Sequence, residues 1–169
     1  MIDDTTGLTQ ASVSHVVDQI IGVVFNKART EIKMPRNRKE VNRAVEKFHI
    51  ISGFPRVIGT IDGTHIPIKA PYVNEHLFVN RKGYHSLNLQ VVANTDQLIT
   101  SYCVKYPGST HDSYIWNNCP LKHCFQAGIY GDTHLLGDSG HLLTPFLLTH
   151  ISNPKNCGEE SYNRSHTKI

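Results

Sequence analysis

Two aspartates, Asp62 and Asp138, each end an apolar run; Asp62 stands directly before Gly63, and Asp138 stands two residues before Gly140. A carboxylate at the end of a buried strand is costly to desolvate, and a bound divalent cation is one compensating partner. Two such carboxylates on neighbouring strands, with a third from a following helix, can hold two Mg²⁺ or Mn²⁺ ions about 4 Å apart. Such ions activate a water or a DNA 3′-hydroxyl for in-line attack on a phosphodiester. The two aspartates are therefore candidate metal ligands and catalytic residues.

Each acidic residue also has a plainer interpretation. Asp62-Gly63 is a common signal of a two-residue hairpin turn, and Asp138 is compatible with an ordinary turn before Gly140. Asp112, which follows His111, fits a helix cap as well as a supporting role at a metal site. Taken singly, these residues leave both interpretations open.

The N-terminal part of the chain is predicted to be helical. Apolar residues recur over residues 12–28 at the spacing of one helical face. The entry to this helix, residues 7–17, resembles the turn and second helix of a helix-turn-helix, with an ordinary packing helix as the alternative. Asn37 and Glu40 predict a capping box for a second helix. We expect residues 1–52 to be a helical segment separate from the sheet, the remnant of a helix-turn-helix-like region.

A basic run crosses the junction between these two helices. It could contact DNA phosphates, and a solvated helix face is the alternative. The candidate DNA contacts in this run are Lys33, Arg36, Arg38, Lys39 and Arg43.

Beyond Gly53 the hydrophobic period changes from that of a helix to that of strands. The predicted elements are extended segments over 57–62 and 64–68, a hairpin of 86–93 and 98–106, a helix over 113–125 interrupted by Pro120, and a strand over 133–138. This order predicts an α/β fold with a ribonuclease H-like mixed sheet and flanking helices. Such a sheet would carry carboxylates on neighbouring strands.

Composition restricts the class of protein without identifying it. The 169 residues suit one domain with a small appendage, and 39% hydrophobic content is enough for a core. Neither a membrane span nor a signal peptide is recognisable, which predicts an intracellular protein. The charge of +3 permits nucleic-acid contact without requiring it. The four irregularly spaced cysteines are expected to be free thiols, mostly buried.

Two other site chemistries match single motifs of the sequence. The segment Gly137 to Gly140 matches the nucleophile motif of trypsin-like proteases, but that class needs two β-barrels and a longer chain. A zinc site is the second alternative, and its spacing matches no common finger. Its ligands would be Cys119, His123, Cys124 and His134.

Five segments, in order, resemble the sequence blocks of the Harbinger (PIF) DDE transposases. They are GFPRVIGTIDGTHI (53–66), NRKGYHSLNLQ (80–90), YPGSTHDS (106–113), LLGDSGH (135–141) and YNRSH (162–166). The resemblance implies that Asp62 and Asp138 are the first two members of the DDE triad. It further implies Mg²⁺ or Mn²⁺ as cofactor, supporting roles for His111 and Asp112, and DNA contacts by the second block. The second-block candidates are Arg81 and Lys82.

By this resemblance, residues 53–169 are a DDE transposase-like catalytic core. The implied activity is metal-dependent DNA cleavage, by phosphodiester hydrolysis or strand transfer, in the nucleus with the cytoplasm as a second location. DNA and a separate Myb-like or SANT-like protein are the implied partners. A non-enzymatic DNA- or protein-binding remnant of a domesticated transposase is the alternative.

The chain departs from the family pattern in its third acidic residue. In the family, the glutamate follows the YNRSH-like block in an Arg-x-x-x-Glu stretch, and the 169 residues end before that stretch. We therefore expect a core without its C-terminal helix, and impaired nuclease activity. Glu159 and Glu160 precede the block and are expected in a loop. His141 stands where the family usually has an aromatic residue.

Overall fold

The structure is a computed structural model that describes residue 7 and residues 9–168. Residue 8 of the helix-turn-helix-like entry over residues 7–17 therefore lies outside the described residues. The chain forms two compact units, Met1–Lys33 and Met34–Ile169. The first unit contains α1 (Gln10–Glu31), which begins where the Thr9 side chain accepts a hydrogen bond from the Ser12 amide. The predicted amphipathic helix is confirmed, and it runs further in both directions than the apolar pattern.

The second unit begins with a capped helix, α2 (Arg38–Ser52). Asn37 Oδ1 accepts from the Glu40 amide at 3.0 Å, and Glu40 Oε2 accepts from the Arg36 amide at 2.8 Å, so the predicted capping box is confirmed. Phe48 is buried in one cluster with Val57 and Leu136 of the sheet. Because its apolar face packs there, α2 belongs to the unit of the sheet rather than to a separate helical segment.

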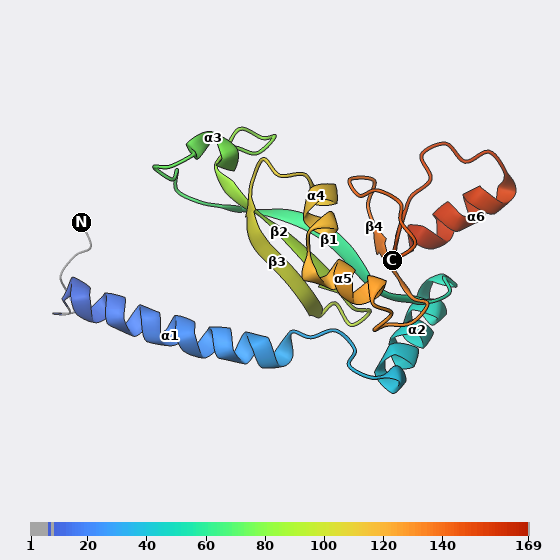
Figure 1. The fold of residues 1–169 in the computed structure, drawn as a ribbon, viewed down its shortest axis with the longest axis horizontal. Helices are drawn as coiled ribbons and strands as arrows, with labels where there is room; N and C mark the ends of the chain where they lie inside the picture. Colours follow the sequence, from blue (N-terminus) through green and yellow to red (C-terminus); the bar gives the residue numbers. More distant parts are fainter. Residues whose placement is uncertain (1–6, 8, 169) are drawn as a thin grey trace. The chain divides into compact units, whose positions relative to one another are not determined.

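A five-stranded mixed sheet forms the centre of this unit (Figure 1). Its strands are β1 (Val57–Pro67), β2 (Ser86–Ala93), β3 (Ile99–Pro107), β4 (His134–Gly137) and β5 (Leu147–Thr149). The spatial order is β3-β2-β1-β4-β5. The first three strands are antiparallel neighbours, and β4 and β5 continue the sheet in parallel with β1. The expected α/β class with a ribonuclease H-like mixed sheet is confirmed.

The two extended segments predicted around Asp62 form one continuous strand. Asp62 pairs with Val91 and Gly63 with Gln90 in the antiparallel β1–β2 ladder. The hairpin-turn interpretation of Asp62-Gly63 is therefore wrong, and Asp62 does not end its strand. The pairing of β1 with β2, which extends to Pro67, overrides the local turn signal.

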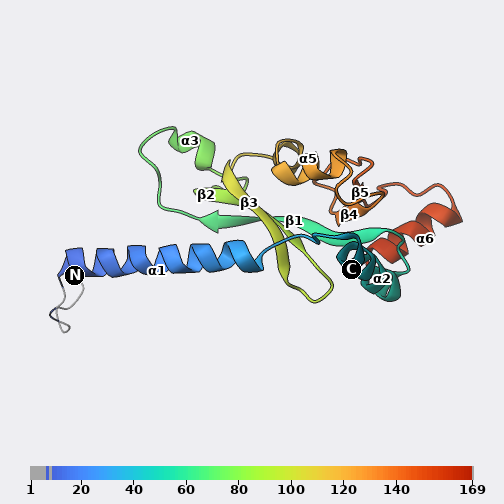
Figure 2. The same cartoon turned by 60° about the horizontal axis from the view of Figure 1, so that its bottom comes forward.

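Helices cover both faces of the sheet (Figure 2). The helix predicted over 113–125 is split, as Pro120 suggested, into α4 (Asp112–Asn117) and α5 (Pro120–Gln126). These two helices bury Trp116 and Phe125 against one face, together with Leu135 of β4. On the other face, Phe48 of α2 and Tyr162 of α6 (Cys157–His166) pack near Leu136. Leu135 and Leu136, which are neighbours on β4, therefore pack against helices on opposite faces of the sheet.

The remaining helix is short: α3 (Glu75–Phe78) lies in the connection between β1 and β2. In the part of the chain that the structure describes, no helix is both long enough and apolar enough to cross a membrane.

Candidate active site

The backbone register brings Asp62 and Asp138 to neighbouring positions. Ile61 of β1 is the register partner of Gly137 in the parallel strand β4, and each aspartate directly follows one of these two residues. The pairing of β1 with β4 ends there, so the two strands separate where the aspartates stand. This is the arrangement expected of carboxylates on adjacent strands of a ribonuclease H-like sheet.

The loop after β4 fixes the Asp138 carboxylate. Its Oδ1 accepts from the Gly140 amide at 3.0 Å and lies 3.0 Å from His141 Nδ1. The His141 side chain is fully buried, whereas the side chain of Asp138 is 59% exposed. Asp138 therefore presents an oriented, solvent-accessible carboxylate, with a buried imidazole behind it.

Asp112, the first residue of α4, lies close to the same place from the other side. A Cβ atom at Gly140 would be 3.1 Å from Asp138 Oδ1 and 3.5 Å from Asp112 Oδ2, so both carboxylates face one point. A Cβ atom at Gly63 would lie 2.5 Å from Asp112 Oδ1. Gly63 is therefore needed for Asp112 to lie against β1 beside Asp62.

The side chain of Asp62 is placed differently from the other two. Alternation along β1 puts Gly63 on the face covered by Asp112, and hence Asp62 on the opposite face. Asp62 Oδ1 accepts from the amide of Gly63 at 2.8 Å. Among the described residues, no three His, Cys, Asp or Glu side chains are grouped so as to hold a metal ion. The structure thus brings together Asp112 and Asp138, with Asp62 next to them along the backbone.

A row of buried polar residues on β2 supports Asp112. Ser86, Asn88 and Gln90 alternate along the strand, and all three are buried. Asn88 Nδ2 donates to Asp112 Oδ1 at 2.8 Å and to the Thr110 carbonyl at 2.9 Å. Gln90 Nε2 reaches the Asp112 carbonyl at 3.5 Å. The sequence alone does not point to these residues, because an alternating strand is expected to turn its polar side to solvent.

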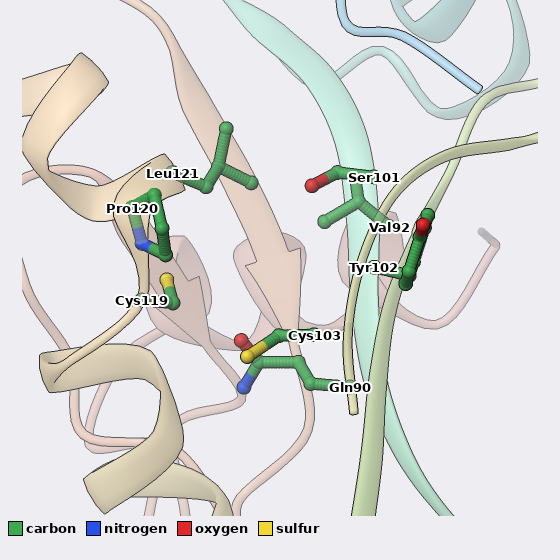
Figure 3. A pocket seen from close by; sticks show the side chains of 8 residues that line it. All are labelled: Gln90, Val92, Ser101, Tyr102, Cys103, Cys119, Pro120 and Leu121. Atoms are coloured by element: carbon green, nitrogen blue, oxygen red, sulfur yellow. The ribbon is translucent and has the colours of Figure 1, made fainter. Parts of the chain in front are cut away.

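Behind Gln90 is a small cavity of about 80 Å³ (Figure 3). Cys119, Pro120 and Leu121 line it from the side of α5, and they face Gln90 and Cys103 on the strands. Burial raises the pKa of the Cys119 thiol, which keeps it protonated. The thiols of Cys103 and Cys119 line this cavity, which lies beneath α5 and not at the carboxylates of Asp112 and Asp138.

The cysteines are free, as expected, but they are less buried than expected. Cys119 is buried, Cys103 and Cys124 are partly buried, and Cys157 is exposed. Cys157 begins α6, whose surface-facing first turn accounts for this exposure.

Glu159 and Glu160 lie in the first turn of α6, so the expectation of a loop is wrong. The Asn156 side chain accepts from the Glu159 amide at 3.0 Å, and Glu159 Oε2 accepts from the Lys155 amide at 2.6 Å. This is a second capping box, which the sequence also contains as Asn156-x-x-Glu159. The Glu159 carboxylate is therefore engaged in capping the start of α6.

The basic candidates occupy three places. Lys33 belongs to the first unit, whereas Arg36, Arg38, Lys39 and Arg43 belong to the second unit and are exposed at or just before α2. Arg81 and Lys82 are exposed in a turn whose conformation is fixed by Asn80, because Asn80 Oδ1 accepts from the Lys82 amide at 2.9 Å. Arg81 and His111 both line a polar cavity that includes Asp112.

Comparison with known proteins identifies the family. A family model described as "DDE superfamily endonuclease" matches residues 61–169. The relatives include "Putative nuclease HARBI1" of Rattus norvegicus, which is 34% identical over 164 residues, or 97% of this chain and 47% of the relative. HARBI1 of Homo sapiens is 32% identical with the same coverage. "Protein ALP1-like" of Arabidopsis thaliana is 26% identical over 184 residues, or 99% of this chain and 45% of the relative.

The chain spans about half the length of these curated relatives. No solved structure matches it. The family match nevertheless includes Asp62, Asp112 and Asp138, and it covers β4 and α6 as well as most of β1. The resemblance to the Harbinger-type transposases is thereby confirmed, and the chain belongs to the DDE superfamily endonucleases.

Proposed function

We propose that this chain carries the first part of the active site of a divalent-metal-dependent DNA nuclease, which acts by phosphodiester hydrolysis or strand transfer. The observation that carries the proposal is the position of Asp62 and Asp138, each directly after a residue of the register pair Ile61–Gly137. Asp112 adds a third carboxylate on the side of α4.

The donor chemistry fits Mg²⁺ or Mn²⁺. Asp138 Oδ2 and Asp112 Oδ2 lie 3.4 and 3.5 Å from one point beside Gly140, and carboxylate oxygens are the preferred ligands of both ions. Asp138 and Asp112 are the residues whose carboxylates face that point and would hold an ion, and Asp62, beside them along the backbone, would join them once its side chain turned from the other face of β1. Bound there, divalent ions would stabilise negative charge on the phosphodiester oxygens.

The other residues of the site orient these carboxylates. The Gly140 amide and His141 Nδ1 hold Asp138 Oδ1, while the Asn88 amide group holds Asp112 Oδ1. Each contact leaves the second oxygen of its carboxylate available to a ligand. Preorganised ligands of this kind cost little reorganisation when substrate binds.

DNA is the proposed substrate, with the basic residues of the α2 region and the Arg81 turn as phosphate contacts. A Myb-like or SANT-like partner and nuclear location are proposed on the family resemblance alone. By the family resemblance, a glutamate in the Arg-x-x-x-Glu stretch after the YNRSH-like block would supply the third carboxylate of the triad. Glu159 does not replace it, since its carboxylate is held by the Lys155 amide.

The test is nicking of supercoiled plasmid DNA with Mn²⁺ by the 169-residue polypeptide and by the same chain extended with the glutamate-bearing helix of a relative. Each is compared with its Asp138→Asn and Asp62→Asn variants, which remove one negative charge and keep the side-chain size. We expect metal-dependent nicking by the extended chain that either variant abolishes. An extended, folded chain that binds DNA and never cuts would favour the non-enzymatic alternative.

A further inference from the structure

We infer that a polar cavity beside Asp112 is a subsite for one unpaired DNA nucleotide next to the cleaved phosphate. The inference rests on the proposed function and specifies the form of DNA at that site. The cavity measures about 200 Å³, several times the ~30 Å³ that one water occupies in the liquid. Its walls include Asp112, Arg81, Asn88, His65 and His111.

The strand register explains why these residues share one cavity. His65 of β1 is the partner of Asn88 on β2, just as Gly63 is the partner of Gln90. Positions 63 and 65 therefore face the same side of the sheet, which is the side on which Asp112 lies against Gly63. The cavity is thus continuous with the surroundings of the candidate metal ligands.

The cavity has preformed walls. The Gly108 amide donates to the Ser86 carbonyl at 2.8 Å, and a Cβ atom at Gly108 would lie 2.2 Å from Ser86 Oγ. This close approach fixes the loop of residues 108–111 against β2. The Ser86 hydroxyl also links two residues that line the cavity: Asn80 Nδ2 donates to Ser86 Oγ at 2.9 Å, and Ser86 Oγ lies 3.1 Å from His65 Nδ1.

The polar groups of the cavity require a ligand with both negative charge and hydrogen-bond donors. Arg81 supplies a cation, which suits a phosphate. Asn88 is only 3% exposed, and its Oδ1 has no hydrogen-bond partner among the described residues. Its amide orientation is fixed, because Nδ2 donates to two oxygens, those of Thr110 and Asp112. A buried acceptor of this kind is satisfied by an N–H or O–H group, which a nucleotide base carries and a bare phosphate diester does not.

A base within a duplex keeps donors only at its groove edges and is held in the stack, so it cannot reach Asn88, which is only 3% exposed. An unpaired base can leave the stack and enter a protein pocket. An aromatic surface adjoins the cavity across the loop of residues 108–111: Tyr114 is 56% exposed, and its ring lies 5.9 Å from that of Tyr106. Exposed aromatic rings near a cationic side chain such as Arg81 are suited to binding single strands by stacking.

The test measures binding by fluorescence anisotropy in EDTA, so that it is independent of metal and of cleavage. The probes are a labelled single strand and a hairpin duplex that contains the same sequence. We expect Tyr114→Ala to weaken single-strand binding about tenfold or more, as loss of one stacked base does, and to leave duplex binding unchanged. Tyr114→Phe keeps the ring and should bind as the parent does. Tyr72→Ala, at a fully exposed ring outside the cavity, is the matched control.

A second pair of variants tests the cavity itself. Ser109 lines it and is exposed, so Ser109→Trp fills space without disturbing the core, and Ser109→Ala controls for the lost hydroxyl. We expect only Ser109→Trp to reduce the preference for single strands. The subsite would be excluded if the parent chain bound both probes with equal affinity. It would also be excluded if Tyr114→Ala lowered the affinity for both probes equally. A single-strand preference that persists in Asp138→Asn supports it even where cleavage is absent, so the two proposals fail separately.

Discussion

Asp112 and Gly63 are in such close contact that residue 63 must be glycine for α4 to begin where it does. The Oδ1 atom of Asp112 is 2.5 Å from the position of a Cβ atom on residue 63, and its Cγ is 2.8 Å away. One glycine of β1 thus determines whether the Asp112 carboxylate can face that of Asp138.

Gly63→Ala should therefore weaken metal binding more than it weakens the fold. The new methyl group displaces the carboxylate of Asp112, and disturbing the surroundings that orient a metal's ligands costs roughly 10- to 100-fold in metal affinity. Calorimetric titration with Mn²⁺ measures this change, and thermal unfolding measures stability. Gly22→Ala is the matched control, because a Cβ atom there would have no neighbour within 4 Å among the residues that the structure describes. Unchanged Mn²⁺ affinity in Gly63→Ala would exclude Asp112 from the metal site.

His141→Phe should raise stability and lower metal affinity. The buried His141 ring has one nitrogen on Asp138 and a second nitrogen, Nε2, without a partner among the described residues. Removing a buried unsatisfied nitrogen should raise the free energy of unfolding by about 1 kcal/mol. Without the imidazole to orient Asp138, Mn²⁺ binding should weaken about tenfold. Urea denaturation and Mn²⁺ titration on the same samples separate the two effects, and a destabilised variant would contradict the first.

Stability should fall as the pH falls below about 6.5 because of His166. Burial on α6 lowers the pKa of this imidazole from its ordinary value of 6.5. The unfolded chain then binds a proton at a higher pH than the folded chain does. The contribution of His166 to the free energy of unfolding is fully present above pH 6.5. It is lost as the pH falls toward the lowered pKa of His166 in the folded state. Urea midpoints from pH 8 to 5 measure the effect, and His166→Phe should flatten the curve. An equally steep curve in the variant would assign the effect to other groups.

Duplex DNA binding should depend on salt through the exposed cations of the α2 region. Replacing Arg36, Arg38, Lys39 and Arg43 together by alanine should reduce the slope of log K against log salt by ~0.9 for each phosphate that is no longer neutralised. Anisotropy titrations between low and moderate salt provide the slope. Lys155→Ala, at an exposed lysine far along the chain, is the control. A slope identical to that of the parent chain would show that these residues do not contact DNA.

Thiol reactivity should rank the cysteines by exposure. Cys157 is exposed on α6, whereas Cys119 is buried and its pKa is raised by that burial. Because the thiolate is the nucleophile, iodoacetamide should label Cys157 first and Cys119 only after unfolding. Mass spectrometry of timed digests measures the order, and Cys157→Ser should remove the fast phase. Early labelling of Cys119 would contradict its place in the core.

Elements controlled by local interactions are predictable from the sequence. The Asn37–Glu40 capping box, the hairpin turn at Asn94 and the helix break at Pro120 each depend on residues a few positions apart. The start of α6 at Asn156 follows the same rule, so the expectation of a loop there neglects a local signal that the sequence contains. Short-range hydrogen bonds leave a signature in the sequence because their partners are fixed by spacing.

Features that depend on distant partners are not predictable in this way. The dipeptide Asp62-Gly63 has the signal of a turn, and only its pairing with β2 makes it part of a strand. The inward orientation of Asn88 depends on Thr110 and Asp112, which lie more than twenty positions away. The sequence indicates Asp62 and Asp138 as neighbours along the sheet, but the approach of Asp112 to Asp138 depends on the packing of α4 against β1.

The inward polar row of β2 also has a consequence for how the chain folds. Leu87, Leu89 and Val91 alternate with that row, so a slip of one residue would bury the leucines and turn the amides to solvent. Hydrophobicity alone favours that wrong alignment. The correct one is held at both ends of the strand, by the Asn94 turn and by the amide of Gly108 on Ser86. These two anchors therefore protect the chain from a kinetic trap during folding.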